Sequence, residues 1–350
     1  MSRKGGYNPP KCSRGRSPHA VVPDDLDDVP SGGNVYDRRV LVLLDARVHR
    51  VPVGDPAALA RVLEGLPDEA AVLLDGLVAS RFPTILAPHA RRVRLVVLVH
   101  LPLADERGLA DGRRRELRDL ETAALGHAAA VVVTSHWTAT RLTGSYGVDP
   151  ARIHVASPGV DPAPIARGSA VTGAPPRVLC LGALTPTKGQ DLLVAALDHV
   201  RDRPWSCRLV GPLGRDPGFV AATRTSIAAR GLAGRIVVPG PRSGDALEAE
   251  WAATDLLVLP SRAETFGMVV VEARARGIPV VAADVGGVRE AGPTSWVPAE
   301  NVDALAGVLC RWLADPVLRS GWRISAWAGR GTLTSWTTTS HRLARALGPG

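Results

Sequence analysis

Short apolar runs rich in valine and leucine alternate with segments of helical period along most of this 350-residue chain. Apolar runs of four to eight residues are typical of strands that are buried on both faces of a sheet. Strands of that kind, alternating with helices, form βαβ units in which crossover helices join parallel strands. The alternation stops after residue 156 and resumes at residue 177. The pattern therefore predicts an α/β protein with two Rossmann-like domains.

The two sets of elements can be placed from the sequence. In the first half, the predicted strands are 19–23, 47–53, 70–74, 93–100, 129–134 and 152–156, and the helices are 34–46, 56–64, 113–126 and 137–146. In the second half, the predicted strands are 177–181, 206–210, 235–238, 256–259 and 280–282, each followed by a helical segment. A last helix is predicted over 335–347.

These elements give a domain plan that a chain of this length can accommodate. Residues 1–18 form a Gly-, Pro- and Arg-rich stretch that predicts a disordered basic tail. A first domain over 19–164 is followed by a Pro- and Gly-rich linker at 165–176 and a second domain over 177–334. Residues 335–350 are expected to return as a helix toward the first domain. Ligands of such sheets bind beyond the carboxyl ends of the strands.

Composition excludes several other classes of protein. No apolar stretch approaches the length of about 20 residues that a membrane-spanning helix needs. The basic first residues have no apolar core and so do not resemble a secretory signal, and the cysteines include no CxxC pair. The histidines show no HExxH spacing. We therefore expect a cytoplasmic protein with reduced cysteines, no metal site and no cofactor.

The formal net charge is +8, and part of it lies in two arginine clusters at 91–94 and 113–115. A solvated basic surface explains these clusters, but so does attraction to anionic ligands or to anionic lipid headgroups. Peripheral contact with the inner membrane face is thus an open alternative. Nucleic acid is not expected as a partner, because no aromatic residues interleave with the basic ones.

Lys188 marks the first candidate site. It lies in the loop Leu181-Gly182-Ala183-Leu184-Thr185-Pro186-Thr187-Lys188-Gly189, which leaves a predicted strand and enters a helix. The chain has only three lysines, and the other two lie in the first eleven residues. A compact ammonium group beside a helix start is typical of contacts to phosphate oxygens, although a chance surface lysine is the simpler explanation.

Two carboxylates mark the second candidate site. Glu264 follows the strand 256–259 and precedes a helix, and Glu272 lies about two turns along that helix. The amides of Phe266, Gly267 and Met268 would be unpaired at the helix N-terminus, where the helix dipole favours a diphosphate. Glu264 could instead be a simple cap and Glu272 a surface charge. However, Glu272 lies in an apolar run where an unpaired carboxylate is costly to bury.

Glu264 and Glu272 form the E-x7-E pair of retaining glycosyltransferases of the GT-B fold, and the chain resembles family 4 of those enzymes. The resemblance is tight over 177–292, where it rests on P-S-R-A-E-T-F-G at 260–267 and G-I-P-V-V-A at 277–282. It is looser over 20–345. The looser matches are Lys188-Gly189, Val210-Gly211, Gly286-Gly287, Ser31-Gly32-Gly33, His100 and Pro158-Gly159-Val160-Asp161.

The resemblance implies roles for the second domain. Glu272 would bind the ribose hydroxyls of a nucleoside-diphosphate sugar, which serves as co-substrate. Glu264, with the amides of Phe266, Gly267 and Met268, would hold the sugar and its diphosphate. Lys188, in the loop with Gly182, would neutralise the departing diphosphate.

The resemblance also implies roles for the first domain. Gly32 and Gly33 would let the backbone approach the donor phosphate, and His100 would face the reacting sugar. Taken singly, an ordinary Gly-Gly turn and a capped structural histidine are the alternative explanations of these residues. The acceptor, whether a saccharide, a lipid or a small molecule, is not indicated.

The chain departs from the family pattern at Ala183, where an arginine usually shares the diphosphate with the lysine. Lys188 then acts alone, or Arg262 or Arg215 substitutes. The helix after Gly33 and the segment 290–301 also look short. The prediction is a metal-independent, retaining hexosyltransferase. The alternatives are a non-catalytic nucleotide-sugar or lipid-binding protein of the same fold and, less favoured, an epimerase or a phosphorylase.

Overall fold

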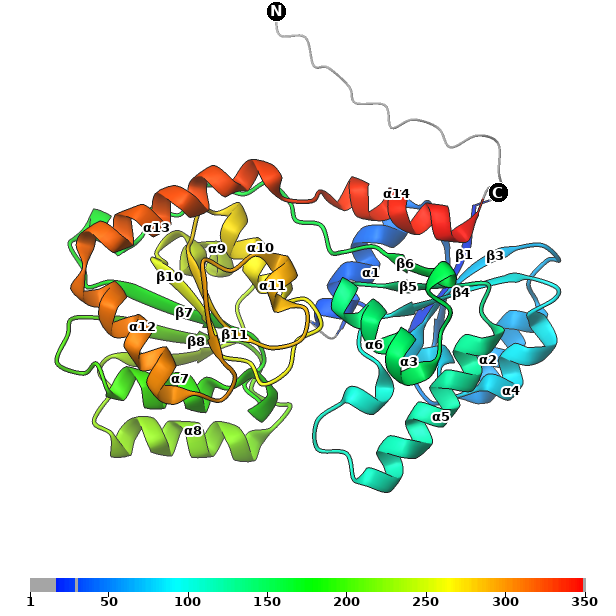
Figure 1. Ribbon diagram of the computed structural model, residues 1–350, viewed down its shortest axis with the longest axis horizontal. Helices are drawn as coiled ribbons and strands as arrows, with labels where there is room; N and C mark the ends of the chain where they lie inside the picture. The colour runs from blue at the N-terminus through cyan, green and yellow to red at the C-terminus, as the bar shows by residue number, and fades with distance from the viewer. Residues whose placement is uncertain (1–16, 29–30, 349–350) are drawn as a thin grey trace, which may run out of the picture. The chain divides into compact units, whose positions relative to one another are not determined.

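The computed structural model describes residues 17–28 and 31–348, which form two compact units (Figure 1). The described part of the first unit comprises 17–28, 31–133, 141–156 and 339–348. The second unit comprises 134–140 and 157–338. The predicted tail lies mostly outside the described residues. Each unit is an α/β structure with one six-stranded parallel sheet, which confirms the predicted fold class.

The sheet of the first unit has the strand order β2-β1-β3-β4-β5-β6. Its strands are β1 (His19–Pro23), β2 (Arg47–Val51), β3 (Ala71–Asp75), β4 (Arg94–Val99), β5 (Ala130–Val133) and β6 (Ile153–Val155). The helices in this half of the chain are α1 (Gly32–Leu43), α2 (Pro56–Glu64), α3 (Gly76–Ala79), α4 (Pro83–Leu86), α5 (Asp111–His127) and α6 (His136–Tyr146), with 3₁₀ turns at Ala87–His89, Leu103–Asp105 and Pro150–Arg152.

The sheet of the second unit has the order β12-β11-β10-β7-β8-β9. Its strands are β7 (Arg177–Leu181), β8 (Ser206–Val210), β9 (Ile236–Gly240), β10 (Leu256–Leu259), β11 (Val280–Asp284) and β12 (Ser295–Pro298). The helices are α7 (Gln190–Asp198), α8 (Pro217–Ala229), α9 (Gly244–Ala252), α10 (Met268–Ala275), α11 (Val288–Ala291), α12 (Val302–Ala314) and α13 (Pro316–Ala328), with 3₁₀ turns at Ser169–Thr172, Pro186–Lys188 and Gly329–Thr332.

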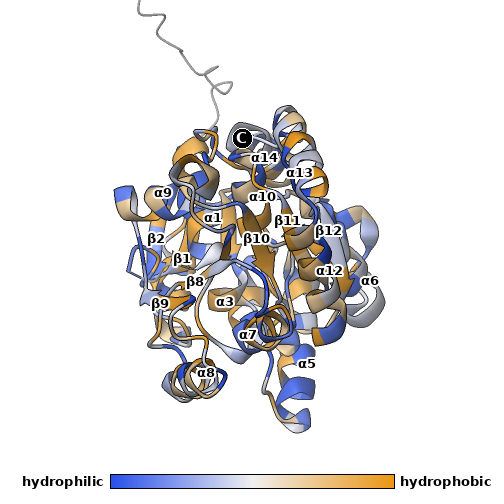
Figure 2. Cartoon of the chain, turned by 90° about the vertical axis from the view of Figure 1, so that its left-hand side faces the viewer, coloured by the Kyte–Doolittle hydropathy of each residue, from blue (hydrophilic) through white to orange (hydrophobic). Residues whose placement is uncertain are grey.

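The sheet of the second unit is buried on both faces, as its continuous apolar strands require. Val178 and Cys180 of β7 belong to one core cluster, and the intervening Leu179 belongs to another. This alternation follows from the two-residue period of a strand. Figure 2 shows the apolar strands of this sheet, including β10 and β11, surrounded by helices of mixed hydropathy. The covered strands hold their terminal loops at fixed positions at the carboxyl edge.

Several predicted boundaries need correction. The first helix begins at Gly32 rather than residue 34, because the Ser31 hydroxyl accepts a hydrogen bond from the Asn34 amide at 3.0 Å and caps it. The helix has twelve residues and is not short. The segment 290–301 contains β12, which pairs in parallel with β11 and was not predicted. The short helices α3 and α4 were also not predicted.

The predicted linker is closely associated with the second unit. The Ala166 amide donates to the Arg276 carbonyl, and the amides of Arg167 and Gly168 both donate to the Ala252 carbonyl. The C-terminal helix α14 (Trp336–Leu347) crosses the unit boundary at residue 339. Its end packs on the first unit, where the Arg94 guanidinium donates two hydrogen bonds to the Ala346 carbonyl. Within the described residues, no helix is both long enough and apolar enough to cross a bilayer.

Candidate functional site

The strand order of the second sheet reverses between β7 and β10, because the chain proceeds outward from β7 in both directions. In open α/β sheets, ligands bind at such a reversal, beyond the carboxyl ends of the strands. The loop after β7 carries Lys188, and the loop after β10 carries Glu264. Two of the residues singled out from the sequence therefore lie at the position where the topology predicts a ligand.

Lys188 and Glu264 form an ion pair, with 2.5 Å between the Lys188 Nζ and the Glu264 Oε1. The same carboxylate oxygen accepts a hydrogen bond of 2.9 Å from the Ser261 hydroxyl. The Glu264 side chain is 11% exposed and that of Lys188 is 32% exposed, so the lysine side chain is the more accessible of the two. The ammonium can therefore bind a ligand without leaving its carboxylate.

Two glycines allow the loops around this pair to pack closely. Gly189 has a φ of +68°, and a Cβ there would lie 2.2 Å from the Pro260 carbonyl oxygen. Gly286 has a φ of +53°, and a Cβ there would lie 1.7 Å from the Glu264 carbonyl oxygen. Both positions exclude a side chain by conformation and by contact. Gly286 thus fixes the backbone of Glu264 against the loop after β11.

Helix α10 begins next to the ion pair. Its N-cap, Gly267, has a φ of +87°, and the first turn closes with a hydrogen bond from the Val270 amide to the Gly267 carbonyl. The amides at such a helix start have no carbonyl partner within the helix. The Phe266 side chain is buried in the core, and Met268 packs against the same cluster. The backbone of these residues, not their side chains, is what a ligand could contact.

Glu272 lies on the second turn of α10 in a different environment. Burial raises the pKa of its carboxyl to about 7, although the nearby Arg276 guanidinium opposes the shift, and Glu248 and Asp161 add to it. Arg276 donates to the Glu248 carboxylate at 2.5 Å and to the Glu272 carbonyl oxygen at 3.0 Å. The guanidinium is thus bound by a neighbouring acid, and Glu272 is poised to change its charge near neutrality.

Arg262 is not positioned as a substitute for the arginine missing at 183. Its guanidinium donates to both Asp191 carboxylate oxygens, at 2.9 and 2.7 Å, and to Glu300 at 2.6 Å. Its charge is therefore neutralised by two carboxylates, and the expectation that it serves the diphosphate is not supported by this geometry. Arg215, the other candidate, is exposed in the loop between β8 and α8.

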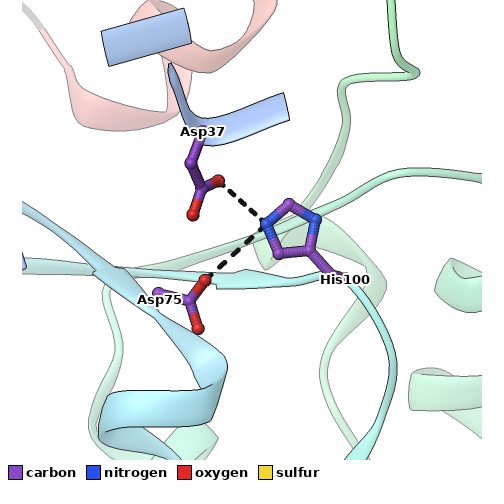
Figure 3. Close-up of side chains that lie close together, drawn as sticks. All are labelled: Asp37, Asp75 and His100. Atoms are coloured by element: carbon purple, nitrogen blue, oxygen red, sulfur yellow. Dashed lines mark hydrogen bonds and ion pairs between the residues drawn. The ribbon is translucent and has the colours of Figure 1, made fainter. Parts of the chain in front are cut away.

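The first unit assembles a second group of polar side chains. Its strand order reverses between β1 and β3. Asp75 ends β3, His100 follows β4, and Asp37 lies one turn into α1 (Figure 3). The His100 Nε2 lies 2.8 Å from the Asp37 Oδ1 and 3.7 Å from the Asp75 Oδ2. A Cβ on Gly33 would lie 3.3 Å from the His100 ring, so Gly33 leaves room for this imidazole.

The segment after His100 is anchored by a buried acid. Glu121 on α5 accepts a hydrogen bond of 2.8 Å from the Leu103 amide and has no solvent exposure. Burial raises the pKa of this carboxyl to about 7, while the hydrogen bond from the Leu103 amide opposes the shift. The segment that follows His100 is thereby held against α5.

Within each unit, the structure brings some of the predicted residues into contact. Lys188 and Glu264 are in contact in the second unit, and Gly33 lies against His100 in the first. Sequence reasoning missed Asp37, Asp75 and Ser261. Asp75 could have been found as a polar residue at the end of an apolar strand. Ser261 could have been found from its position three residues before Glu264 in Ser-Arg-Ala-Glu. No local signal indicates Asp37.

Both halves of the chain match known families. The family described as Glycosyltransferase Family 4 matches residues 13–164, and Glycosyl transferases group 1 matches residues 175–315. The chain belongs to the family 4 glycosyltransferases. The predicted family is therefore confirmed.

Curated relatives agree with this assignment. The D-inositol 3-phosphate glycosyltransferase of Jonesia denitrificans is 34% identical over a match that covers 57% of this chain and 52% of the relative. The protein of the same name from Actinosynnema mirum is 32% identical, with 73% of this chain and 64% of the relative covered. The chain spans about half the length of the first curated relatives it matches.

Solved structures share the fold over nearly the whole chain. Sucrose-phosphate synthase from Thermosynechococcus elongatus has a TM-score of 0.77 at 21% identity and covers 94% of this chain and 98% of its own. HepE of Anabaena, in complex with UDP and glucose, has a TM-score of 0.75 at 19% identity. The match covers 95% of this chain and 99% of the HepE chain. At these identities the likeness establishes the two-unit GT-B fold of the family 4 chain.

Proposed function

We propose that this family 4 protein is a retaining glycosyltransferase that moves a hexose from a nucleoside-diphosphate sugar to an acceptor hydroxyl without a metal ion. The observation that carries the proposal is the Lys188–Glu264 pair at the reversal of the second sheet, beside the start of α10. An ammonium and a set of helix N-terminal amides supply positive potential where a diphosphate leaves. They do so without a metal ion.

The chemistry of transfer follows from these groups. The bond between the anomeric carbon and the diphosphate oxygen breaks, and Lys188 stabilises the charge that develops on the leaving oxygen. The acceptor oxygen attacks on the same face and gives up its proton to the departing diphosphate. Glu264 holds the sugar hydroxyls and keeps Lys188 in position. Retention is checked by the anomeric configuration of the product in NMR, and metal independence by full activity in EDTA.

The first donors and acceptors to test come from the comparisons. HepE has been solved with UDP and with UDP-glucose, which favours a uridine donor as the first probe. The curated relatives are named for inositol 3-phosphate, which makes a phosphorylated cyclitol the first acceptor to assay. A panel of nucleoside diphosphates and their sugars, screened by thermal shift, identifies the donor. A ligand present at 100 times its Kd adds about 2.7 kcal/mol of stability, a shift that is easily measured.

Glu272→Ala is expected to weaken donor binding by about 10- to 100-fold, since hydrogen bonds from ribose hydroxyls to a carboxylate are each worth roughly 1.5–3 kcal/mol. Transfer should be lost in the same variant. Isothermal titration with the best donor of the panel measures the first effect, and product formation measures the second. Wild-type transfer rates in this variant would refute the assignment of Glu272.

Donor affinity should also depend on pH through Glu272. The pKa of this carboxyl is about 7 in the free protein, because burial favours the neutral form. Ribose hydroxyls favour the carboxylate, so binding below pH 7 must release a proton, and affinity falls up to about tenfold per pH unit. UDP-glucose is the appropriate probe because its diphosphate does not titrate near neutrality. In Glu272→Gln the dependence should disappear; an unchanged slope would contradict the role.

A non-catalytic nucleotide-sugar-binding protein is the second candidate, and Ala183 is the observation that favours it. The position that usually supplies an arginine supplies only a methyl group, and Arg262 is committed to Asp191 and Glu300. Release of free sugar from the donor in the absence of acceptor separates the two candidates. A transferase hydrolyses its donor slowly, whereas a protein that only binds the donor releases none.

A further inference from the structure

We propose that Asp37 is a positioning residue that, together with a protonated Asp75, holds His100 as an imidazolium whose Nδ1–H is presented to a ligand oxygen. The role of His100 toward the donor sugar rests on the proposed function, whereas its charge and orientation do not. Asp37 and Asp75 come from two different elements and are 1% and 3% exposed. The two carboxyl groups are therefore enclosed in the first unit, whereas the side chain of His100 beside them is 18% exposed (Figure 3).

The orientation of the imidazole follows from hydrogen bonding. The 2.8 Å contact between His100 Nε2 and Asp37 Oδ1 requires a proton on Nε2, because the aspartate oxygen accepts. The second ring nitrogen, Nδ1, points away from both acids in Figure 3. The ring of Tyr36 meets the imidazole edge-on, with 5.2 Å between centroids, and Gly33 also lies against the imidazole. The ring plane is thus fixed.

The charge of the cluster follows from burial. Two enclosed carboxylates without counter-charges would be costly, and Asp37 Oδ2 has no hydrogen-bond donor among the described side chains. A proton on Asp75 supplies that donor and removes one charge. Burial, together with the negative charge of Asp37, raises the pKa of Asp75 and so favours its protonated form. The remaining charge of Asp37 then matches one positive charge on His100.

The pKa of His100 is raised as well. Burial alone would lower the pKa of His100, but the charge and hydrogen bond of Asp37 are the larger of the opposing influences, and the pKa is raised. Tyr36 is a further titratable group against the ring; its buried hydroxyl donates to the Ala156 carbonyl and its pKa is raised, so it is neutral at pH 7. Arg342 acts on Tyr36 from α14.

An imidazolium is a stronger donor than a neutral imidazole. Charge-assisted hydrogen bonds are about twice as strong as neutral ones, and they strengthen further toward an oxygen that gains charge. Asp37 therefore acts through His100 and does not itself touch the sugar. A neutral imidazole with a proton on Nε2 would instead offer Nδ1 as an acceptor.

The experiment separates the charge from the orientation. Asp75→Asn keeps a neutral group beside Asp37 and should leave His100 unchanged, which makes it the matched control. Asp37→Asn keeps an acceptor for Nε2, but Asp75 then becomes free to ionise in its place. The double variant Asp37→Asn with Asp75→Asn removes both charges while burial remains. In that variant the His100 pKa should fall below 6.5, whereas in the wild type it lies above 6.5.

NMR titration of the imidazole signals, assigned by their loss in His100→Gln, measures this pKa in the intact chain without any substrate. A wild-type value at or below 6.5, or an unchanged value in the double variant, would overturn the proposal. Line broadening of the His100 signals by micromolar Mn²⁺ would also overturn it, since the cluster would then hold a cation in place of the protons. If the double variant does not fold, Asp37→Ala combined with Asp75→Asn provides the comparison, because it also removes both charges.

Kinetics supply the second readout. At pH 7, kcat/KM of the double variant should fall by about 10- to 100-fold. In the wild type, kcat/KM should decline as the pH rises through the His100 pKa. In the double variant this decline of kcat/KM should occur at lower pH. A uniform loss with an unmoved pH profile would mean that the acids are only structural. If the NMR titration shifts in the double variant but His100→Gln transfers sugar at the wild-type rate, Asp37 still positions His100. Only the contact of His100 with the sugar would then be refuted.

Discussion

Lys188→Ala is expected to reduce transfer by about 10²- to 10³-fold, the usual effect of removing one group that stabilises developing charge. The ammonium lies 2.5 Å from Glu264, at the reversal of the second sheet. Its loss removes the positive charge that faces the leaving diphosphate. It also leaves the mostly buried Glu264 carboxylate with the Ser261 hydroxyl as its remaining hydrogen-bond donor. The decrease should appear in kcat more than in KM, because the charge develops in the transition state.

Arg224→Ala is the matched control, since it also removes one positive charge from the same unit, at an exposed position of α8. Its rate should stay within about twofold of the wild type. If both variants lose activity equally, long-range attraction explains the effect and the specific role of Lys188 is wrong. Combining Lys188→Ala with Glu264→Gln should cost far less than the sum of the two single effects, because the two side chains act as a unit.

Gly286→Ala is expected to destabilise the protein by roughly 2–4 kcal/mol and to reduce transfer by about 10²-fold. The new methyl group would lie 1.7 Å from the Glu264 carbonyl oxygen, at a φ of +53° that alanine adopts only with strain. The backbone of Glu264 must then move away from the loop after β11. The Glu264 carboxylate would no longer lie beside the Lys188 ammonium. Urea unfolding gives the stability change, and initial rates give the second effect.

Gly214→Ala is the control for this substitution. A Cβ at Gly214 meets no atom within 4 Å, and its φ is not positive. The variant should be as stable as the wild type or slightly more stable, because alanine restricts the unfolded chain. Equal losses in the two variants would mean that the contact between Gly286 and Glu264 does not hold the site together.

The sequence predicts the central elements well, because a parallel sheet buried on both faces leaves a plain apolar signature. Strands β1, β7, β8 and β10 were predicted with their observed boundaries. Strand β12 was missed because Ser295–Pro298 lies at the sheet edge with an exposed Trp296, so its run is neither long nor continuously apolar. The short helices α3 and α4 span a single turn each, which is less than a periodic pattern needs.

The two candidate sites differ in how far the sequence predicts them. Lys188, Glu264 and Glu272 were found because each stands in a local pattern that the family resemblance supports; their roles remain predictions. Asp37 and Asp75 lie 38 positions apart and converge on His100 only through the strand order of the first sheet. No local pattern carries that information. Likewise, the ion pairs of Arg262 with Asp191 and Glu300 depend on the relative positions of two loops and the first turn of α7.

The division of the chain between its two units has a consequence for synthesis on the ribosome. The first unit uses residues 339–348, which are translated after the whole of the second unit. Leu343 and Ala346 are fully buried, so the nascent first half has an uncovered apolar surface until α14 emerges. The second unit is complete earlier and can fold first. A fragment that stops at residue 156 should therefore aggregate, and adding residues 339–348 through a flexible linker should restore its solubility.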